Sequence, residues 1–185
     1  MALVRGRTLV PLRAFVKETY GEPGWQRLLG ELPPPVREIL DGLIVPDAWY
    51  DRTAHVGLLE ASFHLWGGEA PDLGRKMGGR VAKHHDRFYL RPLLKLGGPM
   101  AVISRAASLY RDYFQGGEMS IVERRDHGAR VTLSDPHCPP QFCRETLLGF
   151  IEELIRLAGR KPVRVIQDVC RYDGATHCEM DIEWT

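Results

Sequence analysis

The sequence predicts an α+β fold in which four antiparallel strands are covered on one face by helices. Apolar residues recur at three- and four-residue spacing through most of the first 115 residues, which indicates helices. Over 119–133 the pattern changes to strict alternation, over 140–158 it becomes helical again, and over 163–184 it alternates a second time. This order of helices, hairpin, helix and hairpin predicts one helical layer packed on one sheet.

The first segment, 8–45, is predicted to form short helices that dock on the main body. Glycines and a proline at 21–24 and the prolines at 33–35 interrupt the helical pattern. Between these breaks, large apolar residues such as Trp25 and Leu28 supply the docking face. We therefore expect a single domain over 1–185, made of an N-terminal helical extension, 1–45, and an α+β core, 46–185.

Three further helices are predicted in the middle of the chain. Asp51 is placed to cap a helix over 52–66, a second helix starts after Asp72 and runs towards residue 89, and a third spans 100–114. The second contains Gly74, Gly78 and Gly79, each of which costs a helix about 1 kcal/mol relative to alanine. Close helix packing, a dimer seam or the approach of a ligand would offset this cost, and packing is the favoured explanation.

The last hairpin is predicted to turn at Asp173 and Gly174, because glycine adopts positive φ readily. This register places Cys170 opposite Cys178 and Ile166 opposite Ile182 on one buried face. The helix over 140–158 must cover that face, and Cys143 begins its apolar stripe. Three thiols are therefore expected to converge.

Converging thiols allow three interpretations, which the sequence leaves open. They pack as small apolar groups, they pair oxidatively, or they bind a soft metal such as Zn²⁺. A tetrahedral zinc site needs a fourth ligand, and the candidates nearby in sequence are His177, His137, Cys138, Asp168 and Gln167. A redox pair is the least favoured interpretation, because Cys170 and Cys178 lack the helix N-terminal position that lowers a thiol pKa.

Composition and motifs limit the classes of function. With 25 basic and 24 acidic side chains the formal charge is +1, so no general attraction to nucleic acid is expected. No stretch reaches the about 20 apolar residues of a membrane span, and a cytoplasmic location is expected. Because the sequence shows no nucleophile elbow, phosphate loop, dinucleotide fingerprint or zinc-protease motif, an enzyme is not expected.

The helical half is rich in aromatic residues that could line an apolar pocket, with Arg105 or His64 as a polar contact. The alternative is that these rings belong to an ordinary core. The aromatic residues concerned are Trp49, Tyr50, Phe63, Trp66, Phe88, Tyr110, Tyr113 and Phe114, of which Trp49, Phe63, Trp66, Phe88 and Tyr110, with Arg105, are the predicted pocket.

The C-terminal segment from Val169 to Trp184 resembles the ending of the 4-vinyl reductase domain superfamily, with a cysteine, a glycine turn, a second cysteine, an alternating strand and a tryptophan. That superfamily includes sensor domains of aromatic-responsive activators, and its fold is similar to that of heme-NO-binding domains and of TRAPP vesicle-tethering subunits. Across the sequence 25–184 the chain looks more narrowly like a myxobacterial paralogous family of unknown function.

The resemblance implies a domain that often forms dimers through its helices and holds a small molecule between helices and sheet. In the phenol-type sensors three cysteines and a glutamate hold zinc; the thiols correspond to Cys143, Cys170 and Cys178, and the glutamate to Gln167. Since a neutral amide is a poor zinc ligand, this departure weakens the zinc assignment. The heme-NO-binding relatives use a Tyr-x-Ser-x-Arg signature, but the nearest segment here, 103–105, lacks the tyrosine, so heme is not expected.

These observations favour a non-enzymatic sensory or regulatory domain that binds a small apolar ligand and acts as a homodimer. The alternative is an interaction or scaffold module of the tethering type, in which the same helical face binds a protein partner. An enzyme ranks third, because no acid, base and nucleophile converge in the sequence.

Overall fold

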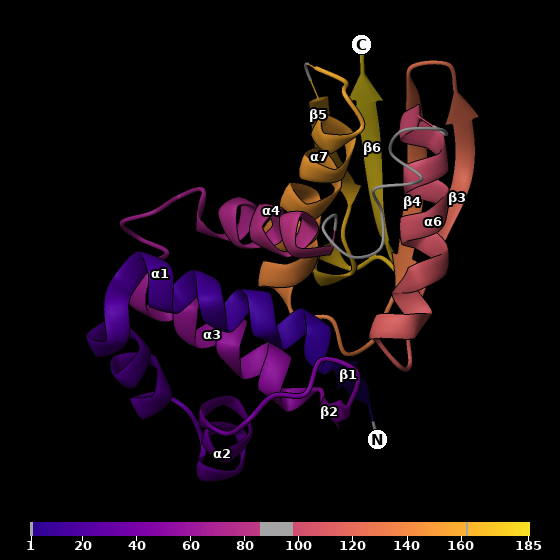
Figure 1. The fold of residues 1–185 in the computed structure, drawn as a ribbon. Coiled ribbons are helices and arrows are strands. Elements are labelled where there is room, and N and C mark those ends of the chain that lie inside the picture. Colours follow the sequence, from indigo (N-terminus) through magenta and orange to yellow (C-terminus); the bar gives the residue numbers. More distant parts are fainter. Residues whose placement is uncertain (1, 86–97, 162) are drawn as a thin grey trace.

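The computed structural model describes residues 2–85, 98–161 and 163–185. Its main sheet has four antiparallel strands in the order β3-β4-β6-β5, with β3 over Glu118–Arg125, β4 over Gly128–Ser134, β5 over Val163–Val169 and β6 over Cys178–Trp184. The N-terminal helices lie below this sheet in Figure 1, and the chain ends at its top. The α+β class predicted from the sequence is confirmed.

Three helices make the N-terminal part. They are α1 over Gly6–Gly30, α2 over Pro34–Asp41 and α3 over Thr53–Trp66. The predicted break at 21–24 is a kink within α1, where Gly21 adopts φ 70°. The N-cap of α3 is Arg52, one residue after the predicted Asp51, whose carboxylate still accepts the backbone N–H of Thr53 at 2.9 Å.

A two-stranded sheet that the sequence analysis did not predict joins the N-terminus to residues 49–51. Strand β1, Leu3–Arg5, pairs antiparallel with β2, Trp49–Asp51. The sequence indicated only a turn around Trp49, because strands of three residues are too short for alternation to be recognised.

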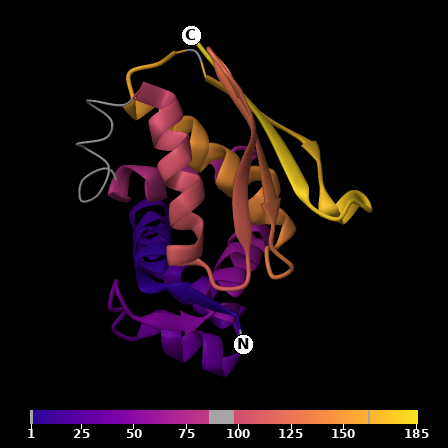
Figure 2. The same ribbon diagram turned by 90° about the vertical axis from the view of Figure 1, so that its right-hand side faces the viewer.

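Helices lie on one face of the main sheet, and none of the helices that the structure describes lies over the other face (Figure 2). The covering layer contains α6, Gly98–Tyr113, and α7, Leu147–Leu157, and α4, Leu73–His85, packs across α7. The predicted extension of α4 from residue 86 towards 89 lies outside the described residues. Among the helices that the structure describes, none has the length and apolar character needed to span a membrane.

Helices α4 and α7 touch through their backbones, and glycine permits this. A Cβ at Gly78 would overlap the carbonyl oxygen of Thr146, and a Cβ at Gly149 would overlap the backbone of Arg75. At Gly79 the nearest atom would lie 3.8 Å away, on Glu153, which is ordinary contact. Close helix packing, the favoured explanation for these glycines, is therefore confirmed at Gly78.

The register of the last hairpin agrees with the prediction at the pair next to the turn and differs from it further along the strands. Val169 pairs with Glu179, as a turn centred on Gly174 requires, but Ile182 lies opposite Val165 and not opposite Ile166. A β-bulge between Gln167 and Val169 causes this one-residue shift. The side chain that joins the buried face is consequently Val165, which is 3 % exposed.

The predicted helix over 140–158 is not α-helical throughout. Its first turn, Phe142–Thr146, is a π helix in which the N–H of Leu147 bonds the carbonyl of Phe142, and α7 follows directly. Apolar spacing could not reveal this, because one five-residue π turn displaces the stripe by only one position.

Candidate functional site

The thiols of Cys143, Cys170 and Cys178 meet in one buried cluster. Cys143 comes from the π turn, Cys170 follows β5 and Cys178 begins β6. Their sulfur atoms all lie within 4.8 Å of one another, and no residue of the three is more than 5 % exposed. The predicted convergence is confirmed, and the described residues include no disulfide among these cysteines.

Among the candidates for a fourth ligand, Cys138 is the one placed beside the cluster. It is 1 % exposed, and its thiol interacts with that of Cys143. His177 instead lies 3.7 Å from Glu179 on the outer side of β6, while His137 and Asp168 are exposed. Gln167 lies on β5 opposite Met180, and its buried side-chain nitrogen has no hydrogen-bond partner among the described residues.

The thiols of Cys143 and Cys178 are held in their neutral form. The hydrogen bond with Cys138, followed by burial, raises the pKa of Cys143 to about 12. The hydrogen bond with Cys143, again with burial, raises the pKa of Cys178 well above its usual range. A metal ion would have to displace these protons, and a donor set made only of sulfur favours soft ions such as Zn²⁺ or Cu⁺. The cluster could thus hold a metal ion.

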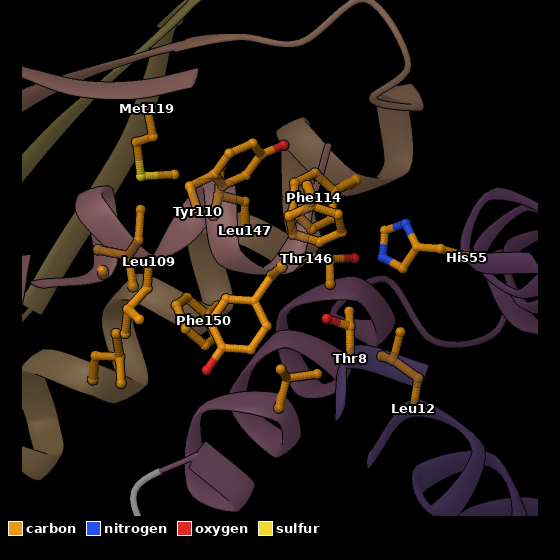
Figure 3. A pocket seen from close by; sticks show the side chains of 16 residues that line it. Thr8, Leu12, His55, Leu109, Tyr110, Phe114, Met119, Thr146, Leu147 and Phe150 are labelled. Atoms are coloured by element: carbon orange, nitrogen blue, oxygen red, sulfur yellow. The ribbon is translucent and has the colours of Figure 1, made fainter. Parts of the chain in front are cut away.

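A second feature is a cavity between the helical part and the sheet, with a volume of about 60 Å³. Helices from both halves of the chain supply its walls, together with the first residues of β3 and the π turn (Figure 3). The walls are almost entirely apolar, and the lining residues are Thr8, Leu12, His55, Val81, Ala106, Leu109, Tyr110, Tyr113, Phe114, Met119, Phe142, Thr146, Leu147, Phe150, Ile151 and Leu154.

His55 forms the polar end of this cavity. Its side chain is fully buried, and neither ring nitrogen has a hydrogen-bond partner among the described residues. The imidazole is turned towards Phe114 and Thr146 (Figure 3), and its centroid lies 5.3 Å from that of Phe114 and 5.2 Å from that of Phe142. Burial, with the nearby charge of Arg52, holds the pKa of His55 well below 6.5, so the ring is neutral.

A buried ion pair lies next to the cavity and joins the two halves of the chain. Arg52, at the start of α3, donates to the carboxylate of Asp135 at 2.7 Å, and the two side chains are 3 % and 0 % exposed. The hydroxyl of Tyr110 donates to the same carboxylate oxygen at 2.6 Å. The guanidinium of Arg52 also lies 4.1 Å from the ring centroid of Phe114, so this network contacts two residues of the cavity wall.

The π turn belongs to both features. Phe142 and Thr146 line the cavity, whereas Cys143, between them in sequence, contributes to the thiol cluster. The hydroxyl of Thr146 donates to the carbonyl of Gln141 at 3.2 Å, which ties the two ends of the turn together. Single π turns inside helices are frequent at functional sites.

The aromatic residues selected from the sequence do not form one pocket. Tyr110, Tyr113 and Phe114 line the cavity, but Trp66 stacks on Tyr20 with centroids 3.8 Å apart. The ring of Trp49 lies under the guanidinium of Arg5 at 4.0 Å, Phe63 packs at the edge of the core, and Phe88 lies outside the described residues.

The polar contacts proposed for that pocket also lie elsewhere. Arg105 is exposed on α6, and the side chain of His64 is 74 % exposed. Sequence reasoning missed His55, Phe142 and Thr146. His55 sits within an apolar helix, and only its unpartnered nitrogens distinguish it from a core residue, which a sequence cannot show.

Together, the sheet, its helical cover and the cavity between them define the class of fold. A crystal structure of an H-NOX protein from S. oneidensis in the Fe(II)NO ligation state matches 98 % of this chain and 99 % of its own, with a TM-score of 0.75 and 14 % identity. An Fe(II) unliganded H-NOX protein from K. algicida matches 98 % of this chain and 96 % of its own, with a TM-score of 0.75 and 12 % identity. This chain therefore has an H-NOX-like fold.

Within that fold class, the sequence over 88–185 matches the family described as "Protein of unknown function (DUF2378)". The match covers more than half of the chain, which therefore belongs to this family. A search of curated proteins found no match to the chain.

The cavity, as the described residues form it, is too small for a heme. Another similar structure, with a TM-score of 0.70 and 13 % identity, concerns heme distortion in the H-NOX family. Pockets for ligands of drug size measure about 300–1,000 Å³, several times the volume of about 60 Å³ found here. Ser104, in the segment nearest to the propionate signature, bonds the carbonyl of Met100 and the side chain of Arg124 instead.

Proposed function

We propose that this protein is a non-enzymatic sensory domain that binds a small, largely apolar molecule in the cavity between α3, α6 and α7. The observation that carries the proposal is the combination of apolar walls with one neutral, unpartnered imidazole, that of His55. Binding sites for small molecules are typically apolar surfaces with a few polar groups that orient the ligand. The likeness in fold to H-NOX proteins supports a sensory role.

The size of the cavity limits the ligand to a compact molecule. An engineered cavity of about 150 Å³ binds benzene or xenon, whereas the volume here is about 60 Å³. Xenon and molecules of a few non-hydrogen atoms are thus the ligands expected to bind without rearrangement. A small hydroxyl compound could also bond His55, because a neutral imidazole offers one donor and one acceptor.

Nuclear magnetic resonance under xenon pressure tests this proposal. We expect saturable shifts of the methyl groups of Leu109, Leu147 and Met119, which line the cavity, and none for Leu40 in α2. Leu147→Phe, which fills the cavity from α7, should abolish the response. If the methyl groups lining the cavity respond no more than Leu40, the proposed function is wrong.

As a second candidate function, the thiol cluster binds Zn²⁺. The three sulfur atoms within 4.8 Å of one another support this, with Cys138 or Gln167 as a fourth ligand. Elemental analysis should find one zinc per chain in the purified protein and a marked loss in Cys178→Ser. Wild-type protein that holds substoichiometric zinc and stays folded after chelation would show that the cysteines only pack.

We propose a cytoplasmic homodimer that transmits ligand occupancy through a helical interface, in keeping with the resemblance to 4-vinyl reductase-type sensors. A tethering module that binds a protein partner is the alternative, and it predicts that xenon binds nowhere in the chain. Heme remains excluded from the proposal, and a purified sample should show no Soret band.

A further inference from the structure

We propose that a soft metal ion in the thiol cluster holds the π turn in place and so restricts the cavity to compact ligands. This inference rests on the proposed function and adds a regulation to it. The domain would then respond to two chemical inputs, a soft cation such as Zn²⁺ and a small apolar molecule. The π turn Phe142–Thr146 is the element that both inputs reach.

A metal ion bound by the thiol cluster must act on the π turn. Zinc binds thiolates at about 2.3 Å, which requires sulfur atoms about 3.8 Å apart in a tetrahedral site. The sulfur atoms here lie within 4.8 Å of one another, so any contraction of the cluster on binding is about 1 Å or less. Cys170 and Cys178 flank the end of the hairpin, whereas Cys143 lies in the turn, and the contraction therefore pulls the turn towards the hairpin.

The π turn has an alternative conformation. A π turn contains one residue more than an α-helical turn, and such turns are rare. Relaxation into an α-helix would move the residues before α7 by one position, about 1.5 Å along the axis and 100° around it. Cys143 would then leave Cys170 and Cys178, and Phe142 would leave the cavity wall. A metal bound through Cys143 opposes this relaxation.

The position of Phe142 decides the size of the cavity. Its ring lies 5.2 Å from His55 and 5.4 Å from Phe114, and it closes the polar end of the cavity. The volume of about 60 Å³ is less than half that of the engineered cavity of about 150 Å³ that binds benzene. Withdrawal of one phenyl ring is a large change on this scale, and it would open the space that benzene needs.

Neighbouring contacts hold the turn on its other sides. Gly78 on α4 lies against the carbonyl of Thr146, and the loop before the turn is tied to the buried ion pair because Cys138 donates its N–H to the carbonyl of Asp135 at 3.3 Å. Helix α7 continues directly from the turn. The turn can therefore move only in concert with residues that line the cavity.

The test compares binding of xenon and benzene to zinc-loaded and chelator-treated protein, followed through the methyl groups of Leu109 and Leu147. We expect xenon to bind both forms with affinities within about twofold, and benzene to bind the zinc-loaded form at least fivefold more weakly, in the usual range of allosteric coupling. By reciprocity, saturating benzene must weaken zinc binding by the same factor. In Cys178→Ser, added zinc should leave benzene binding unchanged.

If xenon binds but the benzene affinities of the zinc-loaded and chelator-treated forms are within twofold of each other, the inference is wrong and the proposed function still holds. If neither probe binds either form, the proposed function fails. In that case the coupling is tested by zinc alone, which should shift the NMR signals of the Leu147 methyl groups and leave those of Leu40 unchanged. If the Leu147 signals do not shift, the inference is wrong. If the chelator-treated protein unfolds, the zinc affinity of the folded protein can be measured by competition with a chelator, with and without benzene. The ratio of the two zinc affinities is the same coupling factor.

Discussion

At the scale of single residues, the neutral imidazole of His55 has a consequence for stability. Burial and the charge of Arg52 keep its pKa well below 6.5 in the folded state, whereas in the unfolded chain it titrates near 6.5. The unfolded state therefore binds more protons below pH 6.5, and the stability contribution of His55 is complete above that pH and is lost as the pH falls. The guanidinium of Arg52 is itself paired with Asp135, at 2.7 Å.

We expect the free energy of unfolding to fall by up to about 1.4 kcal/mol between about pH 7.5 and pH 5.5 because of His55. His55→Leu should remove this part of the pH dependence. It should also stabilise the protein by about 1 kcal/mol at neutral pH, since the two unpartnered nitrogens are no longer buried. Urea denaturation at the two pH values measures both effects, and an unchanged difference between them in the variant would contradict the assignment.

The buried pair of Arg52 and Asp135 gives a second prediction at this scale. Arg52→Leu should destabilise the protein by about 3–5 kcal/mol, because it leaves a buried carboxylate without its counter-charge. The hydroxyl of Tyr110 and the N–H of His137 still donate to that carboxylate, so the protein should remain foldable. The double variant Arg52→Leu with Asp135→Leu should recover most of the loss. Thermal and urea unfolding test this, and a double variant no more stable than Arg52→Leu would argue against charge burial as the cause.

At the scale of helices, the crossing of α4 and α7 provides a matched pair of substitutions. Gly78→Ala should cost about 1–3 kcal/mol, because the new methyl group would overlap the carbonyl of Thr146 and force the helices apart. Gly79→Ala should instead stabilise the protein by up to about 1 kcal/mol, since its methyl group meets nothing closer than 3.8 Å and alanine favours the helix. Equal effects of the two substitutions in urea unfolding would contradict the close crossing.

Much of the element order and the thiol cluster could be predicted from the sequence because both depend on local patterns. Periodicity places α3, α6 and the two hairpins, and a glycine turn places Cys170 near Cys178. The β-bulge at 167–169 and the π turn each insert a single residue, which leaves the apolar pattern almost unchanged. The cavity depends on contacts between distant segments, such as His55 with Phe142, for which a single sequence carries no signal.

At the scale of the whole molecule, the predicted single domain can be tested through cooperativity. The cavity is lined by α1 and α3 from one half and by α6 and α7 from the other, and the pair of Arg52 and Asp135 crosses between these halves. One continuous core cluster includes Trp25 in α1 and Ile182 in β6. Separation of the halves would expose this core and a buried charge, so neither half should unfold alone.

We therefore expect one unfolding transition for the entire chain. Native-state hydrogen exchange should give the slowest amides of α1 and of β6 the same free energy of opening, equal to that of global unfolding. The substitution Arg52→Leu should lower both by the same amount, because it destabilises the common unit. If the amides of α1 open at a distinctly lower free energy than those of β6, then residues 1–45 form an extension that unfolds by itself. In that case the residues of α1 that line the cavity would leave it before the sheet unfolds, and ligand binding would be lost at the free energy at which α1 opens.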